Sequence, residues 1–189
     1  MNKIILASQS PRRKELLNML GIPFDVIVAD IDEQIDYRNN LVEEIKKLSY
    51  QKANAVFENH QDNIVIGSDT IVYINNEVLG KPKTMENAKE MLHKLSNKTH
   101  QVVTAVTIMS KEKTDTFASI TDVTFYELTD KEINDYVEST EPLDKAGAYA
   151  IQGKGCEFVK AINGDYYTVV GLPIAEVLRH LRTFKADIV

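Results

Sequence analysis

The stretch ILASQSPRRKELL, residues 5–17, predicts a strand, a loop and a helix whose first turn is positively charged. Residues 4–7 form a short apolar run that suits a buried strand. Ser10 is a suitable helix N-cap, Pro11 suits the first helical position, and a stripe of leucines then supplies the apolar face. A strand that leads directly into a helix is typical of an α/β protein.

The rest of the chain continues this alternation of strand and helix patterns. Asn75-Asn76 and Asn163-Gly164 each predict a tight hairpin, and residues 140–155 predict an ordered loop with short turns. Further strands are expected at 24–28, 63–67, 71–74, 77–79, 100–109, 116–126, 157–162 and 166–170, and further helices at 41–59, 85–95, 129–139 and 173–184. We therefore expect an α/β fold with a mixed twisted sheet flanked by helices, in one domain over residues 1–189, with two lobes around a cleft.

The chain is acidic overall, so its basic residues must act locally. It has 22 Lys and Arg against 28 Asp and Glu among 189 residues, a formal net charge of −6. This balance argues against a broad cationic face for duplex nucleic acid or for an anionic membrane. Cys156 is the one cysteine and is expected to be a small core residue. A single cysteine suits a reducing cytosol, and no signal-peptide or membrane-spanning pattern is present, so we expect a cytoplasmic protein.

The local basic cluster is Arg12, Arg13 and Lys14, which fall in the first turn of the predicted helix. Cations at a helix N-terminus oppose the helix dipole, which favours negative charge there. A bound phosphate would compensate, with Ser8 and Ser10 adding hydroxyl donors. The alternative is a solvated helix start in which Ser10 is only a cap, and the sequence pattern alone leaves both interpretations open.

A second candidate is Gly67-Ser68-Asp69-Thr70, expected at the carboxyl end of a buried strand. A carboxylate there can bind a divalent cation or accept a proton from water, although Asp69 could also only cap the turn after the strand. Asp32 or Glu33 could supply a second carboxylate, and Mg²⁺ usually takes one or two carboxylates plus phosphate oxygens. Three lysines that could complete a cationic site are Lys52, Lys81 and Lys145.

Together, arginines at a helix N-terminus and carboxylates suited to Mg²⁺ indicate hydrolysis of a polyphosphate ester. The four histidines are scattered and suggest no Ser-His-Asp triad, and zinc-ligand spacing is absent. The GxxxxGK[ST] and GxGxxG phosphate-binding signatures are absent as well.

Seven blocks of the chain resemble the Maf family of nucleoside triphosphate pyrophosphatases, also called septum formation proteins, in the order that the family has them. They are LASQSPRRKELL (6–17), DIDE (30–33), QKA (51–53), IGSDT (66–70), LGKP (79–82), DKAGAYAIQGKG (144–155) and GDYYTVVGLP (164–173). The resemblance implies an inosine-triphosphatase-like fold, a divalent metal such as Mg²⁺ or Mn²⁺, and cleavage between the α and β phosphates. It also favours a homodimer, and a cellular role in division arrest or in nucleotide-pool sanitation.

The resemblance also implies roles for individual residues. Asp69 is similar to the catalytic proton acceptor and, with Glu33, to the metal ligands. The residues similar to the family's phosphate and metal site are Ser8, Arg13, Glu33, Lys52 and Lys81. Members that prefer dTTP and UTP carry the residues found here as Arg12, Thr70 and Gln152. A sister group that acts on methylated nucleotides has tryptophan and glutamine at the first two of these positions, which this chain lacks.

Two other functions are alternatives to this interpretation. Asp30-x-Asp32 after an apolar strand suggests a phosphomonoesterase with an aspartyl nucleophile, although Glu33 and Gln34 do not support it. A nucleotide-binding division regulator that does not hydrolyse its ligand would lack Asp69 or the metal carboxylates, and this chain keeps both. The reaction product distinguishes the phosphomonoesterase from a Maf-like enzyme. The phosphomonoesterase would release orthophosphate, and the Maf-like enzyme would release pyrophosphate.

Overall fold

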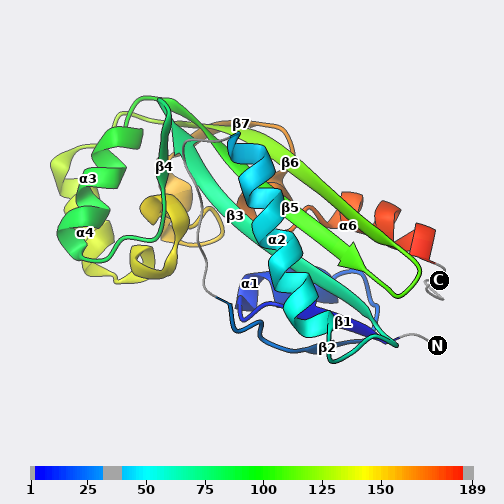
Figure 1. Ribbon diagram of the computed structural model, residues 1–189. Coiled ribbons are helices and arrows are strands. Elements are labelled where there is room, and N and C mark those ends of the chain that lie inside the picture. The colour runs from blue at the N-terminus through cyan, green and yellow to red at the C-terminus, as the bar shows by residue number, and fades with distance from the viewer. Residues whose placement is uncertain (1–2, 32–39, 185–189) are drawn as a thin grey trace. The chain divides into compact units, whose positions relative to one another are not determined.

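A computed structural model of the protein describes residues 3–31 and 40–184, and its centre is one mixed seven-stranded sheet (Figure 1). The strand order is β2-β1-β3-β5-β6-β7, with β4 paired to β3. β1 runs parallel to β2 and to β3, whereas β4 is antiparallel to β3 and β7 is antiparallel to β6. The expected mixed α/β sheet with helices is therefore confirmed.

The strands are β1 Ile4–Ala7, β2 Phe24–Val26, β3 Ile64–Ile74, β4 Glu77–Leu79, β5 Thr99–Met109, β6 Thr114–Phe125 and β7 Val159–Asn163. The α-helices are α1 Pro11–Asn18, α2 Leu41–Phe57, α3 Met85–Leu95, α4 Asp130–Glu138, α5 Tyr166–Val170 and α6 Ile174–Leu181. Four short 3₁₀ helices complete the described segments: η1 Glu141–Asp144, η2 Ala146–Ala148, η3 Lys154–Phe158 and η4 Arg182–Phe184. Within these segments, every helix is too short or too polar to cross a membrane.

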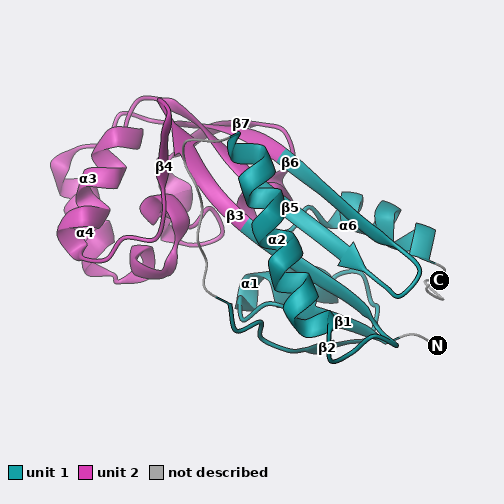
Figure 2. Ribbon diagram, viewed as in Figure 1, with its two compact units in different colours: residues 1–69, 104–119, 171–189 teal, residues 70–103, 120–170 magenta. Residues whose placement is uncertain are grey.

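The chain divides into two compact units, coloured separately in Figure 2. Unit 1 comprises residues 1–69, 104–119 and 171–189, and unit 2 comprises residues 70–103 and 120–170. Strands β3, β5 and β6 each contribute residues to both units, so three of the four boundaries fall inside strands, and the fourth follows α5. The two units match the expectation of two lobes, while the cleft and the single domain over residues 1–189 stay predictions.

Unit 1 is built on the strand–loop–helix segment that opens the chain. Ser10 caps α1 by accepting from the Arg13 backbone N–H, and Leu16 and Leu17 are the buried residues of that helix. One core of this unit packs the apolar face of α2 against strands, and its buried members are Ile5, Ala7, Ala53, Val56, Val65 and Met109. Ala53 and Val56 are three residues apart in α2, and Ile5 and Ala7 are two apart in β1, so each pair lies on one face of its element.

Unit 2 has a separate core beneath α3 and α4. Thr84 caps α3, and Thr129 with Glu132 forms the predicted capping box of α4. The core includes a group of packed aromatic rings, Phe125, Tyr136, Tyr149 and Phe158, together with His100. The predicted Asn75-Asn76 hairpin is confirmed, since both residues have positive φ, at 49° and 62°, between β3 and β4.

Tyr166–Val170 was expected to be a strand but forms helix α5. Its aromatic and β-branched residues favour a strand, yet Asp165 Oδ2 accepts hydrogen bonds from the Thr168 backbone N–H at 2.7 Å and from Thr168 Oγ1 at 2.9 Å. An aspartate whose side chain accepts a hydrogen bond from the backbone N–H three residues later acts as a helix N-cap. This cap outweighs the intrinsic strand preference, so Asn163-Gly164 joins β7 to a helix and not to a second strand.

The expectation that Cys156 is a core residue is wrong, because Cys156 is exposed within η3. In so short a helix the apolar pattern of the sequence does not determine which residues are buried.

Candidate active site

Gly67 lets helix α2 approach strand β3 closely. A Cβ at this position would lie 2.5 Å from the Ser49 carbonyl oxygen and 2.6 Å from the Ala53 backbone nitrogen. Both are backbone atoms of α2, so the helix could not give way to a larger side chain without moving as a whole. The close approach places Lys52, on the same helix, beside Asp69, two residues after Gly67 on the strand.

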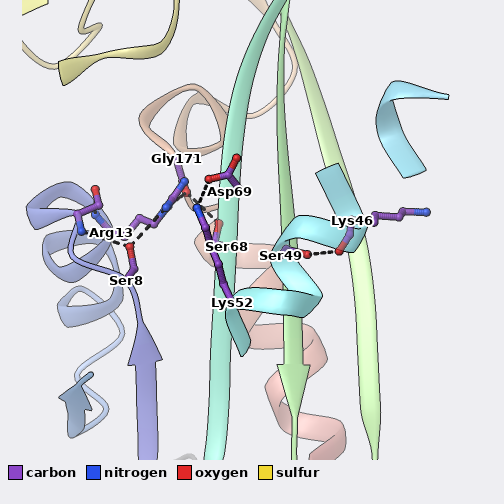
Figure 3. Close-up of polar contacts among 9 residues, drawn as sticks. Ser8, Arg13, Lys46, Ser49, Lys52, Ser68, Asp69 and Gly171 are labelled. Carbon is purple, nitrogen blue, oxygen red and sulfur yellow. Dashed lines mark hydrogen bonds and ion pairs between the residues drawn. The ribbon is translucent and has the colours of Figure 1, made fainter. Parts of the chain in front are cut away.

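The Lys52–Asp69 ion pair joins two residues that the sequence proposed for the site (Figure 3). Lys52 Nζ lies 2.5 Å from Asp69 Oδ1, and the two side chains are only 11% and 14% exposed. The second carboxylate oxygen, Oδ2, takes no part in this contact. Partial burial strengthens the attraction between the two side chains, because less water screens it.

Asp69 lies inside strand β3 and not at a strand end, which corrects the sequence expectation. The parallel partner β1 stops pairing at Ala7–Gly67, and the antiparallel partner β4 begins at Val72. Strand β3 also pairs with β5 in the sheet, so it does not end where its pairing with β1 ends. Asp69 falls in the interval between the two partners, just beyond the carboxyl end of β1, so the principle that sites gather at strand ends still applies to β1.

Arg13 is held by two acceptors in unit 1 (Figure 3). Its Nε donates to the Gly171 carbonyl oxygen at 2.9 Å, and its Nη1 donates to Ser8 Oγ at 3.4 Å. The same Gly171 oxygen accepts from the hydroxyl of the fully buried Ser68 at 3.3 Å. These contacts join the start of α1 to the residue that precedes Asp69. The structure therefore brings Ser8, Arg13, Lys52 and Asp69 into one region of unit 1.

The N-terminus of α1 has the electrostatics of an anion site. The helix has no acidic residue in its first turn, and Arg12 and Arg13 are half-buried there. Ser8 is 8% exposed and also accepts from the Ser10 backbone N–H at 3.2 Å. Backbone N–H groups, the helix dipole and two guanidinium groups all favour a negatively charged ligand at this position.

The remaining predicted binding residues, Thr70, Lys81 and Gln152, belong to unit 2. Thr70 is half-buried in β3, whereas Lys81 and Gln152 are exposed. The Gly147 backbone N–H donates to the Gly80 carbonyl at 3.1 Å, so the segments 79–82 and 144–155 lie side by side. Lys145, expected as a further cation, instead contacts the Asp144 carboxylate and donates to the Glu141 carbonyl at 3.4 Å.

Of the carboxylates expected to bind a metal, the structure describes Asp69. Glu33 and Asp32 lie outside the described residues. Among the residues that are described, no three His, Cys, Asp or Glu side chains form a cluster. Mg²⁺ and Mn²⁺ bound by one or two carboxylates take their other ligands from substrate phosphates and water. A carboxylate with one oxygen outside its ion pair, in the same unit as the positively charged start of α1, fits this mode of binding.

Comparison with known proteins identifies the family. Residues 3–184 match the family described as Maf-like protein. The chain belongs to the Maf family. It is 56% identical over 188 residues to a dTTP/UTP pyrophosphatase from Bacillus cereus (strain G9842), covering all of this chain and 98% of that protein. A dTTP/UTP pyrophosphatase from Bacillus anthracis is 55% identical with the same coverage.

One similar solved structure is a nucleoside-triphosphatase, or dITP/XTP pyrophosphatase, from Mycobacterium abscessus. The similarity covers 96% of each chain, with a TM-score of 0.46 and 12% sequence identity. The seven blocks that suggested the Maf family all start and end between residues 6 and 173, inside the matched range. Family membership is therefore confirmed.

No sequence pattern identifies Gly171 as a partner of the arginine cluster. The block 164–173 resembles the family, but no periodicity or spacing relates its carbonyl groups to Arg13, which is 158 residues away. A backbone acceptor has no side-chain signature, so only the tertiary structure could identify it.

Proposed function

We propose that this Maf family protein hydrolyses dTTP and UTP to the nucleoside monophosphate and pyrophosphate. The observation that carries the proposal is the Lys52–Asp69 pair at 2.5 Å, in the same unit as the Arg13 cluster. A carboxylate held in place by a lysine suits activation of water, and a cationic helix N-terminus suits a polyphosphate. The names of the full-length relatives support the reaction and its two preferred substrates.

In the proposed reaction, water attacks the α-phosphorus while Asp69 accepts one of its protons. The bond between the α-phosphorus and the oxygen that bridges to the β-phosphate breaks, and that oxygen leaves as part of pyrophosphate. Arg13, with its orientation fixed by Gly171 and Ser8, and the neighbouring Arg12 stabilise the charge that develops on the leaving group. Lys52 keeps the Asp69 carboxylate in one orientation, and Lys81 is proposed as a further phosphate contact.

We propose a divalent metal, Mg²⁺ or Mn²⁺, as cofactor, held by Asp69 and Glu33 together with substrate phosphate oxygens. When bound, such an ion would neutralise phosphate charge and polarise a phosphoryl oxygen. Removal of the metal with EDTA should therefore abolish turnover, and restoring Mg²⁺ should recover it.

Selection of the pyrimidine base is proposed for Arg12, Thr70 and Gln152. The exposed Gln152 carries both a donor and an acceptor, which can pair with the polar edge of a pyrimidine. A site that forms such hydrogen bonds discriminates against bases that leave its groups unpaired. We also propose a cytoplasmic location, where nucleoside triphosphates are abundant, and a homodimer, which sedimentation analysis would test.

The test is a panel of nucleoside triphosphates incubated with the protein, with separate assays for pyrophosphate and orthophosphate. We expect pyrophosphate from dTTP and UTP, little from purine nucleotides, and none in EDTA. Release of orthophosphate alone would favour the aspartyl phosphomonoesterase. Nucleotide binding without any product would favour the division regulator that does not hydrolyse its ligand.

A further inference from the structure

The carboxylate of Glu141 caps the backbone beside Gln152. Glu141 Oε2 accepts a hydrogen bond from the Lys154 backbone N–H at 3.0 Å, across 13 residues of chain and within unit 2. Lys154 opens η3, and a carboxylate that accepts from a backbone N–H forms a charge-assisted hydrogen bond. The contact therefore fixes the backbone two residues after Gln152.

Gly153 provides the space for this contact. A Cβ on Gly153 would lie 1.5 Å from Glu141 Oε1, so the carboxylate occupies the volume that any other side chain at this position would fill. The carboxylate thus lies against the residue that directly follows Gln152. Both of its oxygens are engaged with the 153–154 backbone, one by packing and one by hydrogen bonding.

The main chain around Glu141 holds it in place. Thr140 adopts φ 61°, a left-handed conformation that costs free energy for a β-branched residue and persists only where surrounding contacts enforce it. The Glu141 N–H donates to Ser139 Oγ at 3.4 Å, and its carbonyl accepts from Lys145 Nζ at 3.4 Å. Glu141 is half-buried and so is not a freely moving surface carboxylate.

The other side of Gln152 is anchored to the core of unit 2. The Ala150 N–H donates to Tyr136 Oη at 3.1 Å, and the buried Tyr149 hydroxyl is 2.8 Å from His100 Nε2. Gly153 N–H donates to the Ala150 carbonyl at 3.1 Å, closing the turn that contains Gln152. The exposed Gln152 side chain therefore projects from a turn whose two ends are fixed, one by Tyr136 and one by Glu141.

We infer that Glu141 is a positioning residue for base selection, acting through Gly153 and Lys154 to set the orientation in which Gln152 meets the nucleotide base. This inference rests on the proposed function, in which Gln152 contacts the base. Glu141 itself touches neither base nor phosphate in this arrangement. Its loss should therefore change the choice between bases more than the rate of the chemical step.

The test measures the ratio of kcat/KM for UTP to that for GTP by pyrophosphate release. Glu141→Ala should lower this ratio about fivefold to tenfold, the loss expected for one well-placed hydrogen bond. Glu141→Gln should keep this ratio close to that of the unmodified protein, because the glutamine amide oxygen can still accept a hydrogen bond from the Lys154 N–H. Gly153→Ala should mimic Glu141→Ala by displacing the carboxylate, and the double variant should be no worse than either single one.

Two comparisons separate positioning from general damage. Glu138→Gln, an exposed carboxylate at the end of α4, is the matched control and should leave the ratio unchanged. In a Gln152→Ala background, Glu141→Ala should have no further effect on the ratio, because both changes act on the same contact. An unchanged ratio in Glu141→Ala, or an equal further fall in the Gln152→Ala background, would overturn the inference.

Hydrogen exchange gives a second measurement that does not need turnover. Amide exchange in residues 152–156 should be faster in Glu141→Ala than in the unmodified protein, and near normal in Glu141→Gln. If the unmodified protein releases no pyrophosphate, the proposed function fails, and the selectivity comparison is made on the Kd values for UTP and GTP. Equal selectivity and equal exchange in the Glu141→Ala and unmodified proteins would then contradict the positioning role.

Discussion

Lys52 Nζ and Asp69 Oδ1 lie 2.5 Å apart, one on helix α2 and the other on strand β3. Their contact depends on the close packing of the helix on the strand at Gly67. The charged pair is therefore a product of backbone packing, and changes to either the charge or the packing should affect the proposed reaction.

Replacing Asp69 by asparagine should abolish most turnover and spare most nucleotide binding. The amide is nearly the same size but cannot accept a proton from water, and loss of a general base typically lowers kcat by about 10²–10⁴-fold. The measurements are kcat for pyrophosphate release from dTTP and the Kd for dTTP. Asp122→Asn, at a half-buried aspartate of β6 that accepts a hydrogen bond from Gln101, is the matched control. Retained activity would remove Asp69 from its assigned role.

Gly67→Ala should destabilise the protein and reduce activity. The added Cβ meets backbone atoms of Ser49 and Ala53, so α2 must shift, at a cost of about 1–3 kcal/mol or more. Urea unfolding measures this free energy. Gly80→Ala is the control, because a Cβ there meets nothing within 4 Å. Equal unfolding midpoints for the two variants would show that α2 and β3 are not tightly packed at Gly67.

Gln152→Ala should weaken discrimination between bases while leaving the dependence on Mg²⁺ unchanged. Loss of one hydrogen-bonding side chain should reduce the preference for UTP over GTP by about tenfold. The assay compares kcat/KM across nucleotides at several Mg²⁺ concentrations, with Gln101→Ala as a control on an exposed glutamine elsewhere. Comparable kcat/KM for all bases in the unmodified protein would contradict a role for Gln152 in base choice.

The free energy of unfolding should fall in mildly acidic solution, because the unfolded chain binds a proton at His100 more readily than the folded protein does. Burial lowers the pKa of His100 from 6.5 to about 4, and its Nδ1 has no partner among the described residues. The unfolded state therefore binds the proton more readily, so the contribution is fully present above pH 6.5 and is lost as the pH falls from there toward 4. The loss should approach about 1.4 kcal/mol per pH unit.

Unfolding free energies between pH 7.5 and 5.5 test this pH dependence. His100→Gln should unfold with a shallower dependence on pH than the unmodified protein, whatever its absolute stability. His93→Gln, which removes an exposed histidine of α3 in the same unit, is the control for loss of a histidine side chain. Identical slopes for all three proteins would show that His100 is protonated as readily in the folded state as in the unfolded chain.

Asp165→Ala should destabilise α5 by about 1 kcal/mol, the usual value of a helix N-cap. Asp165→Asn should keep most of the stability, because asparagine is an equally good cap. Thermal or urea unfolding provides the comparison. If the alanine variant is as stable as the asparagine variant, the hydrogen bonds to Thr168 do not stabilise this helix.

The sequence by itself determined the elements that depend on neighbouring residues. Ser10 and Pro11 fixed the start of α1, Thr129 with Glu132 fixed α4, and Asn75-Asn76 fixed a hairpin, because caps and turns act within about four residues. The family could also be recognised, since its blocks are local strings in a fixed order. The same local rules failed at Tyr166–Val170, where strand-favouring residues follow an aspartate cap.

Only the tertiary structure decided which groups meet. It places Arg13 on the Gly171 carbonyl, Asp69 beside Lys52 and Glu141 over Gly153, contacts that cross from 12 to 158 residues of chain. Side-chain type shows what a residue can do, whereas its partners depend on how closely backbones pack and on carbonyl groups that carry no sequence signal. For that reason the family was predictable from the sequence, and the groups that orient the proposed site residues were not.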